Sequence, residues 1–149
     1  LNGAKILTDT YMAEAAISPM AKRTLHSNVN CILGMAPQSV DSLSTTRSAI
    51  GMKKMWLDLE KNDQLSVAPI VVIGSAPSAL MALLDLIDKG SKPPSLIIGM
   101  PVGFIGVLEC KNRLLQSNYQ FIVLEGTKGG ASLAACTVNA LLRSAEQCT

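Results

Sequence analysis

The sequence predicts an α/β protein: a three-layer α/β/α sandwich with a mostly parallel, five-stranded sheet. Short apolar runs alternate with longer stretches at helical spacing, and the pair repeats through the 149 residues. Two of the runs, Pro69–Ile73 and Leu96–Ile98, are apolar throughout, which is typical of parallel strands buried on both faces. A chain of this length commonly forms one domain, and no linker interrupts it. We therefore expect a single domain over residues 1–149.

The first third of the chain predicts two strands and two helices. Lys5–Thr8 and Val29–Leu33 are short apolar runs and are expected to be strands. Asp9–Ile17 keeps its apolar residues on one helical face, and Asp9 is a residue type that caps helices. The pair Ser18-Pro19 is expected to end this helix, because the residue before a proline is biased away from helical conformation. The next long helix is expected over Thr45–Leu59, with Trp56 on its apolar side.

The remaining two thirds predict three strand–helix pairs. Pro69–Ile73 is followed by a helix over Ser78–Lys89, whose leucines recur at helical spacing and which Gly90 ends. Leu96–Ile98 precedes a helix over Gly103–Gln116. Phe121–Leu124 is the last strand, and a final helix is expected over Ala131–Arg143.

Composition excludes several functional classes. A net charge of +2, with only two Tyr, two Phe and one Trp, does not suit a nucleic-acid-binding protein. The apolar runs are far shorter than the roughly 20 residues of a membrane-spanning helix. The four cysteines lie at positions 31, 110, 136 and 148, without a CxxC pair and with His26 as the only histidine, so no metal site is expected. We expect reduced thiols in an intracellular, reducing compartment, as in the cytoplasm or an organelle.

The beginning of the chain carries its own expectation. Leu1 is not methionine, and residues 1–11 lack the pattern of a signal peptide. We therefore expect that the chain is processed or is part of something longer.

Three strand ends share one pattern, in which an apolar strand runs into glycine and small residues before a helix. At the carboxyl edge of an open α/β sheet such turns let a ligand approach the backbone, and the free N–H groups of helix starts favour anions. The alternative is that each glycine is an ordinary turn residue, and none of the three turns matches a phosphate loop, a dinucleotide fingerprint or a nucleophile elbow. The candidate ligand-binding residues of these turns are Gly74, Ser75, Ser78, Gly99, Gly103, Lys128, Gly129 and Gly130.

Two other polar residues, Arg47 and Asp9, have two interpretations each. Arg47, beside the hydroxyls of Thr45 and Thr46, is placed to hold a carboxylate, or else it is a solvated arginine in a first helical turn. Asp9 is a candidate acid or base at the end of the first strand, although its spacing favours a helix cap. His26 lies in a polar stretch and is expected at the surface. We expect Asp9, Arg47 and the three turns to converge on one pocket.

The helix predicted over Gly103–Gln116 carries three charged residues. Glu109, Lys111 and Arg113 are expected to pair with one another or to face solvent, because residues three or four apart are neighbours on a helix.

Several stretches of the chain resemble the precorrin-8X methylmutase family of cobalamin biosynthesis. The most specific is Gly99-Met100-Pro101-Val102-Gly103-Phe104-Ile105-Gly106. The others, in family order, are Gly3-Ala4-Lys5-Ile6-Leu7-Thr8-Asp9, Thr46-Arg47-Ser48-Ala49, Val72-Ile73-Gly74-Ser75-Ala76-Pro77-Ser78-Ala79-Leu80, and Lys128-Gly129-Gly130 with Asn139-Ala140-Leu141. The resemblance covers the whole chain.

The resemblance implies a fold and an activity. It implies a three-layer α/β/α fold, usually in a homodimer with active sites near the subunit interface. It also implies an isomerase that moves a methyl group from C11 to C12 of a corrin-type macrocycle, without a separate cofactor. The substrate carries many carboxylates, and the arginine matching Arg47 is implicated in the family's active site.

Departures from the family pattern lead to two hypotheses. The family's acid is a histidine in a segment upstream of the position matching Leu1, and His26 does not match it. Ser75 stands where the family has Asn, and Glu125 stands where it has a cation, which is adverse beside a polyanion. The chain is either part of an isomerase, or a catalytically inactive binding or structural subunit of a larger assembly. We expect the 149 residues alone not to reach a family-like rate.

Overall fold

The computed structural model describes residues 4–24, 26–40, 44–62 and 65–147 of the chain. Its five strands form one sheet in the order β2-β1-β3-β4-β5, and all four pairings are parallel. The strands are β1 (Ile6–Thr8), β2 (Val29–Cys31), β3 (Ile70–Ile73), β4 (Leu96–Gly99) and β5 (Phe121–Val123). The predicted five-stranded sheet is thus confirmed.

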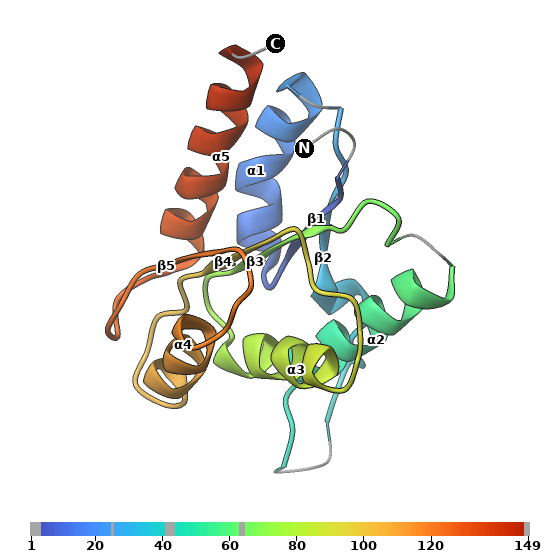
Figure 1. Cartoon of the computed structure of the whole chain (residues 1–149), viewed down its shortest axis with the longest axis vertical. Helices are drawn as coiled ribbons and strands as arrows, with labels where there is room; N and C mark the ends of the chain where they lie inside the picture. Colours follow the sequence, from blue (N-terminus) through green and yellow to red (C-terminus); the bar gives the residue numbers. More distant parts are fainter. Residues whose placement is uncertain (1–3, 25, 41–43, 63–64, 148–149) are drawn as a thin grey trace.

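Helices cover both faces of the sheet, so the predicted three layers are also confirmed. The helices α1 (Tyr11–Thr24) and α5 (Ala131–Gln147) lie side by side on one face (Figure 1). The helices α2 (Arg47–Lys61), α3 (Pro77–Asp88) and α4 (Val107–Leu115) lie on the other. A short 3-10 helix, η1 (Ile32–Met35), follows β2 and packs against α2.

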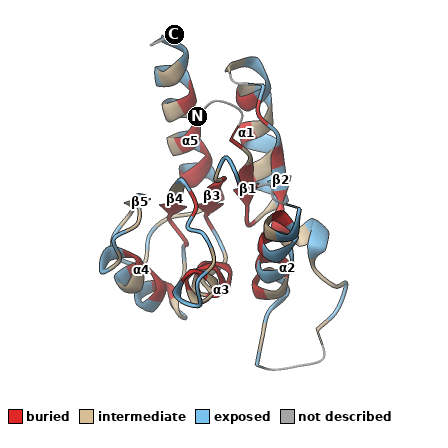
Figure 2. Cartoon of the chain, turned by 45° about the vertical axis from the view of Figure 1, so that its right-hand side comes forward, coloured by how far each residue is buried: buried red, intermediate tan, exposed pale blue. Residues whose placement is uncertain are grey.

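The core has two parts, one on each face of the sheet (Figure 2). The alternation along β3 shows why: Val71 and Ile73 pack toward α2, α3 and α4, whereas Ile70 and Val72 pack toward α1 and α5. All four residues are buried. This confirms that an unbroken apolar run marks a strand covered on both sides.

The helix α1 continues to Thr24, so the prediction that Ser18-Pro19 ends it is wrong. Pro19 has no N–H to donate and lies on the exposed side of the helix. The buried residues Ala13, Ile17 and Ala21 lie four residues apart and form one continuous face through the proline. Packing of this face outweighs the lost hydrogen bond.

Two other predicted boundaries differ from the structure. The helix α4 begins at Val107 rather than at Gly103, because Gly103 and Gly106 have φ of 133° and 71°, outside the helical region. The strand β2 ends at Cys31, where the chain turns into η1. The strand prediction over Val29–Leu33 was therefore two residues too long.

Some features follow directly from the described residues. No helix among them has the length and apolar character needed to cross a bilayer. Cys31 and Cys110 are buried free thiols and Cys136 is an exposed one, while Cys148 lies outside the described residues. Within the described ranges, no three His, Cys, Asp or Glu side chains lie together in a way that could hold a metal ion.

Candidate functional site

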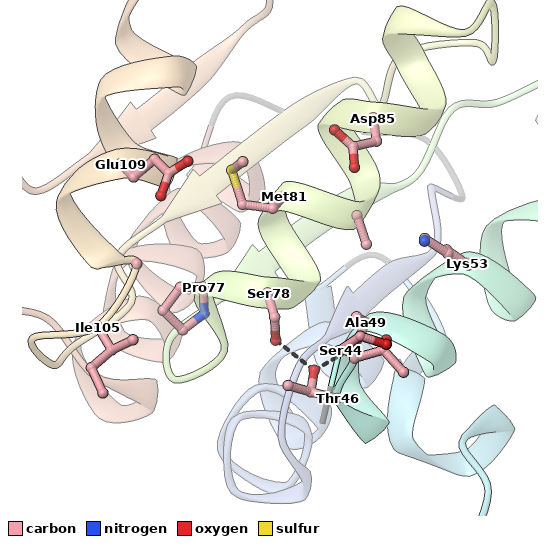
Figure 3. Close-up of a pocket in the computed structure, with 13 residues that line it drawn as sticks. Ser44, Thr46, Ala49, Lys53, Pro77, Ser78, Met81, Asp85, Ile105 and Glu109 are labelled. Carbon is pink, nitrogen blue, oxygen red and sulfur yellow. Dashed lines mark hydrogen bonds between the residues drawn. The ribbon is translucent and has the colours of Figure 1, made fainter. Parts of the chain in front are cut away.

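A cavity of about 520 Å³ opens at the carboxyl edge of the sheet, between α2, α3 and the start of α4. This volume is within the roughly 300–1,000 Å³ of small-molecule sites. The side chains that give it chemistry are Thr46, Lys53, Ser78, Asp85, Ile105 and Glu109 (Figure 3).

Two hydroxyl groups join the helices at the floor of the cavity. Thr46 caps α2, and its Oγ1 accepts a hydrogen bond of 3.1 Å from the Ala49 N–H. The same oxygen shares a hydrogen bond of 2.6 Å with Oγ of Ser78, in the first turn of α3 (Figure 3). Pro77 begins α3, where its fixed φ suits the first helical position. Both hydroxyls therefore have fixed positions at two adjacent helix starts.

The charged groups of the cavity come from three helices. Lys53 projects from α2 and Glu109 from α4, on opposite sides, while Asp85 lies on α3 (Figure 3). Asp85 accepts a hydrogen bond of 2.7 Å from Arg113 on α4, and Arg113 also donates to Asp88 at 2.7 Å. The hydrogen bond from Arg113 lowers the pKa of Asp88 below its usual range.

Arg113 bears on one prediction about α4. It was expected to pair within its own helix or to face solvent, but it is partly buried and pairs with two carboxylates of α3. This pairing offsets the charge of Asp85, so Lys53 and Glu109 are the charges of the cavity lining that no ion pair offsets among the described residues.

Asp9 lies at the point where the strand order reverses, between β1 and β3, and it is almost fully buried. Its carboxylate accepts hydrogen bonds from the backbone N–H groups of Gly74 (3.1 Å), Ser75 (2.6 Å) and Ala76 (2.7 Å). Burial raises the pKa of Asp9, and these hydrogen bonds partly offset the rise. The anion position before α3 is thus filled by the chain's own carboxylate.

The prediction that Asp9 caps the first helix is wrong. The cap is Thr10, whose hydroxyl oxygen accepts a hydrogen bond of 3.2 Å from the Ala13 N–H. Asp9 has both carboxylate oxygens engaged by the turn after β3 instead. Asp9 is 1% exposed, and each of its carboxylate oxygens already accepts a hydrogen bond from the chain itself.

Arg47 follows Thr46 at the same edge of the sheet, but it is not among the residues that line the cavity. Its side chain is exposed, and its Nε donates a hydrogen bond of 2.8 Å to the carbonyl of Pro37. The guanidinium therefore ties the first residue of α2 to Pro37, shortly after η1.

The three predicted turns do meet in space. The Gly130 N–H donates to the Met100 carbonyl at 2.9 Å, and the Gly103 N–H donates to the Thr127 carbonyl at 3.2 Å. The first turn touches the third, since a Cβ on Gly74 would lie 2.5 Å from Cα of Ala131. The turns are thus joined by the backbone itself.

Several of the candidate glycines are surrounded by protein. A Cβ on Gly99 would lie 2.6 Å from the Leu114 side chain, and one on Gly129 would overlap the Met100 carbonyl. Their lack of a side chain permits close packing. Of the eight candidates in these turns, only Ser78 lines the cavity.

Sequence reasoning missed one functional group in this region, the ammonium of Lys111. It is buried, and its Nζ donates hydrogen bonds of 2.7 Å to the carbonyls of Gly126 and Lys128. The prediction that Lys111 pairs within its helix or faces solvent is therefore wrong. A signal was present, because Val107, Cys110 and Leu114 place Lys111 on the buried face of α4.

His26 lies far from these turns. It is exposed, has a φ of 51°, and lies between α1 and β2, at the edge of the sheet where the strands begin. This confirms the expected surface position.

Comparisons with known proteins agree on one family. The model of the family described as Precorrin-8X methylmutase matches residues 1–144. The chain is 36% identical to Precorrin-8X methylmutase of Pseudomonas aeruginosa and 36% identical to Cobalt-precorrin-8 methylmutase of a Synechocystis strain. These matches cover 97% and 95% of this chain, and 67% and 61% of the two relatives.

Solved structures give the same result. The chain superposes on a precorrin-8X methylmutase from Thermus thermophilus with a TM-score of 0.77 and 33% identity, covering 97% of this chain and 68% of that one. It superposes on a "precorrin-8X methylmutase related protein" with a TM-score of 0.78 and 31% identity, covering 96% of this chain and 72% of that one. The chain spans about two thirds of the length of its relatives.

Proposed function

Because the chain belongs to the precorrin-8X methylmutase family, we propose that it binds a precorrin-8-like tetrapyrrole and takes part in its isomerisation. The reaction moves a methyl group from C11 to C12 of the macrocycle and needs no separate cofactor. The observation that carries the proposal is the cavity at the carboxyl edge of the sheet, built from segments that match the family in order.

The lining of the cavity supports the binding of a carboxylate-rich ligand. The hydroxyls of Thr46 and Ser78 can donate hydrogen bonds to carboxylate oxygens, and Lys53 adds a positive charge. Glu109 adds a negative charge, which directs carboxylates toward the Thr46 side. A tetrapyrrole is larger than the drug-sized ligands that such volumes enclose, so one side of the macrocycle would enter and the rest would stay outside.

We assign the protonation of the macrocycle to neither Asp9 nor His26. Asp9 is engaged by three backbone amides, and His26 lies at the opposite edge of the sheet. A positioned acid typically contributes about 10²–10⁴-fold to a rate. We therefore propose that the 149 residues bind and orient the substrate, and that the acid of a full-rate isomerase comes from outside them.

Two further parts of the proposal concern assembly and compartment. We propose a homodimer, supported by Phe104 and Ile105, which are 91% and 92% exposed beside the cavity. We propose a reducing intracellular compartment, supported by the free thiols of Cys31, Cys110 and Cys136.

Binding is tested first, by titrating the chain with precorrin-8 and following the absorbance of the macrocycle. Ser78→Ala is expected to weaken binding about fivefold to tenfold, the effect of one lost hydrogen bond. Thr24→Val is the matched control, because Thr24 ends α1 at the opposite edge of the sheet and its hydroxyl donates to the Met20 carbonyl of its own helix. Equal affinities of both variants and the wild-type chain would contradict the cavity as the site.

Turnover is tested second, by following conversion of precorrin-8 to hydrogenobyrinate. Binding with slow turnover is the expected result. Binding with none at all would favour the second hypothesis, a catalytically inactive binding subunit. Turnover at the rate of an intact relative would contradict the assignment of the acid to a group outside these residues.

A further inference from the structure

The feature that the proposed binding site leaves unexplained is the buried ammonium of Lys111. Lys111 is 1% exposed, yet no carboxylate forms an ion pair with it among the described residues. Its two partners are the carbonyls of Gly126 and Lys128, each at 2.7 Å. A buried charge is costly unless something compensates it, and burial lowers the pKa of this ammonium.

The two carbonyls fix the orientation of the loop between β5 and α5. In a trans peptide the C=O and the following N–H point in opposite directions, and the chain has no cis peptide among its described residues. The Gly126 and Lys128 carbonyls point inward to Lys111, so the N–H groups of Thr127 and Gly129 point away from it. Lys111 thereby keeps these two carbonyls directed toward the protein interior and these two N–H groups directed away from it.

The outward donors have no acceptor in the part of the chain that the structure describes. The N–H groups of Thr127, Lys128 and Gly129 donate to no oxygen of the described residues. The loop is open at its two ends, because nothing lies within 4 Å of a Cβ placed on Gly126 or Gly130, whereas Gly129 packs against the Met100 carbonyl. Consecutive amides in a glycine-rich turn with positive φ form a concave site for anions.

The same molecule contains a filled example of this arrangement. In the neighbouring turn, the amides of Gly74, Ser75 and Ala76 are all satisfied by one carboxylate, that of Asp9. The loop over residues 126–130 lies beside that turn and is joined to the turn after β4 by two backbone hydrogen bonds. Like that turn, the loop offers backbone N–H donors. The Lys111 ammonium lies on the inner side of the loop, and no carboxylate of the described residues accepts a hydrogen bond from these donors.

We propose that Lys111 is a positioning residue for a substrate carboxylate: it turns the amides of Thr127 and Gly129 outward and places its positive charge behind them. The proposal rests on the proposed function for the identity of the ligand, a carboxylate of the tetrapyrrole. Glu125, exposed at the start of the loop, opposes such binding by its charge.

The loop itself is tested with citrate as a carboxylate probe and ¹⁵N-labelled protein. Citrate is expected to shift the amide resonances of Thr127 and Gly129 in the wild-type chain. In Lys111→Met these shifts should be lost, and in Lys111→Arg, which keeps the charge, they should be largely retained. Absent shifts in the wild-type chain, or shifts confined to other loops, would overturn the proposal even if Lys111→Met fails to fold.

The ligand is tested with hydrogenobyrinate, by absorbance titration at low and high salt. Lys111→Met is expected to weaken binding about tenfold at low salt and to reduce the dependence of affinity on salt, because a charge is lost. Lys54→Met, which removes one exposed lysine charge from α2, is the matched control and should change affinity less than about twofold. Glu125→Gln should tighten binding.

The outcomes separate the two proposals. A Lys111→Met variant that binds more weakly but with an unchanged salt dependence has lost only loop structure, which would overturn the positioning role. Citrate shifts without any binding of hydrogenobyrinate would support the anion loop and contradict the proposed ligand. Normal binding of hydrogenobyrinate by folded Lys111→Met would overturn the inference and leave the proposed function standing.

Discussion

At the scale of single residues, Asp9 determines much of the carboxyl edge. Its carboxylate ties the end of β1 to the first residues after β3, the place where ligands of open α/β sheets commonly bind. The crevice at this point is therefore closed by a protein group. The cavity lies instead toward α2 and the start of α4.

The titration of Asp9 gives a prediction about pH. Burial raises its pKa in the folded chain, so the folded state binds the proton more tightly than the unfolded state. The stabilisation linked to this group is full below the unfolded pKa of about 3.9 and is lost as pH rises through the raised folded value. The side chain that Asp9→Asn introduces is an amide, which does not titrate in this pH range. The stability advantage of the wild-type chain over this variant, measured as the difference in free energy of unfolding, should therefore fall with rising pH.

Denaturant unfolding of both proteins between about pH 4 and pH 7 measures this difference. At neutral pH we expect Asp9→Ala to be less stable than the wild-type chain by about 3 kcal/mol, since three backbone N–H groups lose their acceptor. If the stability advantage of the wild-type chain over Asp9→Asn grew with pH, the pKa of Asp9 would be lowered. The hydrogen bonds from the three backbone N–H groups would then outweigh the effect of burial on this pKa.

Gly74 gives a second prediction, based on space. A Cβ at this position would lie 2.5 Å from the Ala131 backbone, which cannot move without shifting α5. We expect Gly74→Ala to lower the free energy of unfolding by about 3 kcal/mol. The control is Gly34→Ala, where nothing lies within 4 Å and a change within about 0.5 kcal/mol is expected. Equal melting temperatures of the two variants would contradict the packing argument.

Lys111 and the glycines show what residue patterns can and cannot establish. The helical spacing of Val107, Cys110 and Leu114 already placed Lys111 on a buried face, although its charge suggested solvent. Whether a glycine at a strand end faces a ligand or the protein depends on neighbours distant in sequence. Gly74 meets Ala131 and Gly129 meets Met100, contacts that no local pattern contains.

At the scale of elements, α1 is the clearest case of packing that outweighs local preference. Pro19 interrupts its hydrogen bonding, yet the helix continues because α5 lies along it. Asn139 of α5 donates a hydrogen bond of 3.1 Å to the carbonyl of Ala16, close to the interruption. The two helices are more than one hundred residues apart in sequence, so the prediction of an end at Ser18-Pro19 lacked the contact that decides it.

This interruption predicts that Pro19→Ala stabilises the chain. The alanine restores an N–H for the Ala15 carbonyl and has the higher helix propensity, so the free energy of unfolding should rise by about 1–2 kcal/mol. Pro77→Ala is the matched control, because Pro77 begins α3 and its missing N–H costs nothing there. Thermal unfolding of both variants measures the effect, and a gain for Pro77→Ala as large as that for Pro19→Ala would contradict it.

Strands were easier to predict than helix ends. The unbroken apolar runs at β3 and β4 indicate strands covered on both faces, which favours a parallel sheet between two layers of helices. The start of α4 was harder, because Gly103 and Gly106 depart from helical φ in a way that sequence does not show.

At the scale of the whole molecule, the two edges of the sheet differ in chemistry. The carboxyl edge holds the cavity, the Asp9 turn and the Lys111 loop, whereas His26 lies at the other. Strand ends placed the three candidate turns at this edge, since a parallel sheet brings all its carboxyl ends together. They did not predict that only one of the three turns would contribute a predicted residue to the cavity.

The carboxyl edge also exposes an apolar loop between β4 and α4, which leads to the last prediction. Phe104 and Ile105 are 91% and 92% exposed, and Val102 and Leu108 flank them at 47% and 49%. Burying such side chains contributes about 1.5–3 kcal/mol each, so a second copy that covers them gains stability from both loops. We expect a dimer in solution, and we expect Phe104→Ser with Ile105→Ser to weaken it at least about a hundredfold.

Light scattering after size-exclusion chromatography, over a range of concentrations, measures this dimer. Val67→Ser is the matched control, because Val67 is 49% exposed and precedes β3 at the opposite edge, so it should leave the dimer intact. A wild-type chain that stays monomeric at high concentration would contradict the dimer. A dimer that survives the double substitution but dissociates in Val67→Ser would place the interface at the other edge, away from the cavity, and would leave Phe104 and Ile105 as a surface for the macrocycle alone.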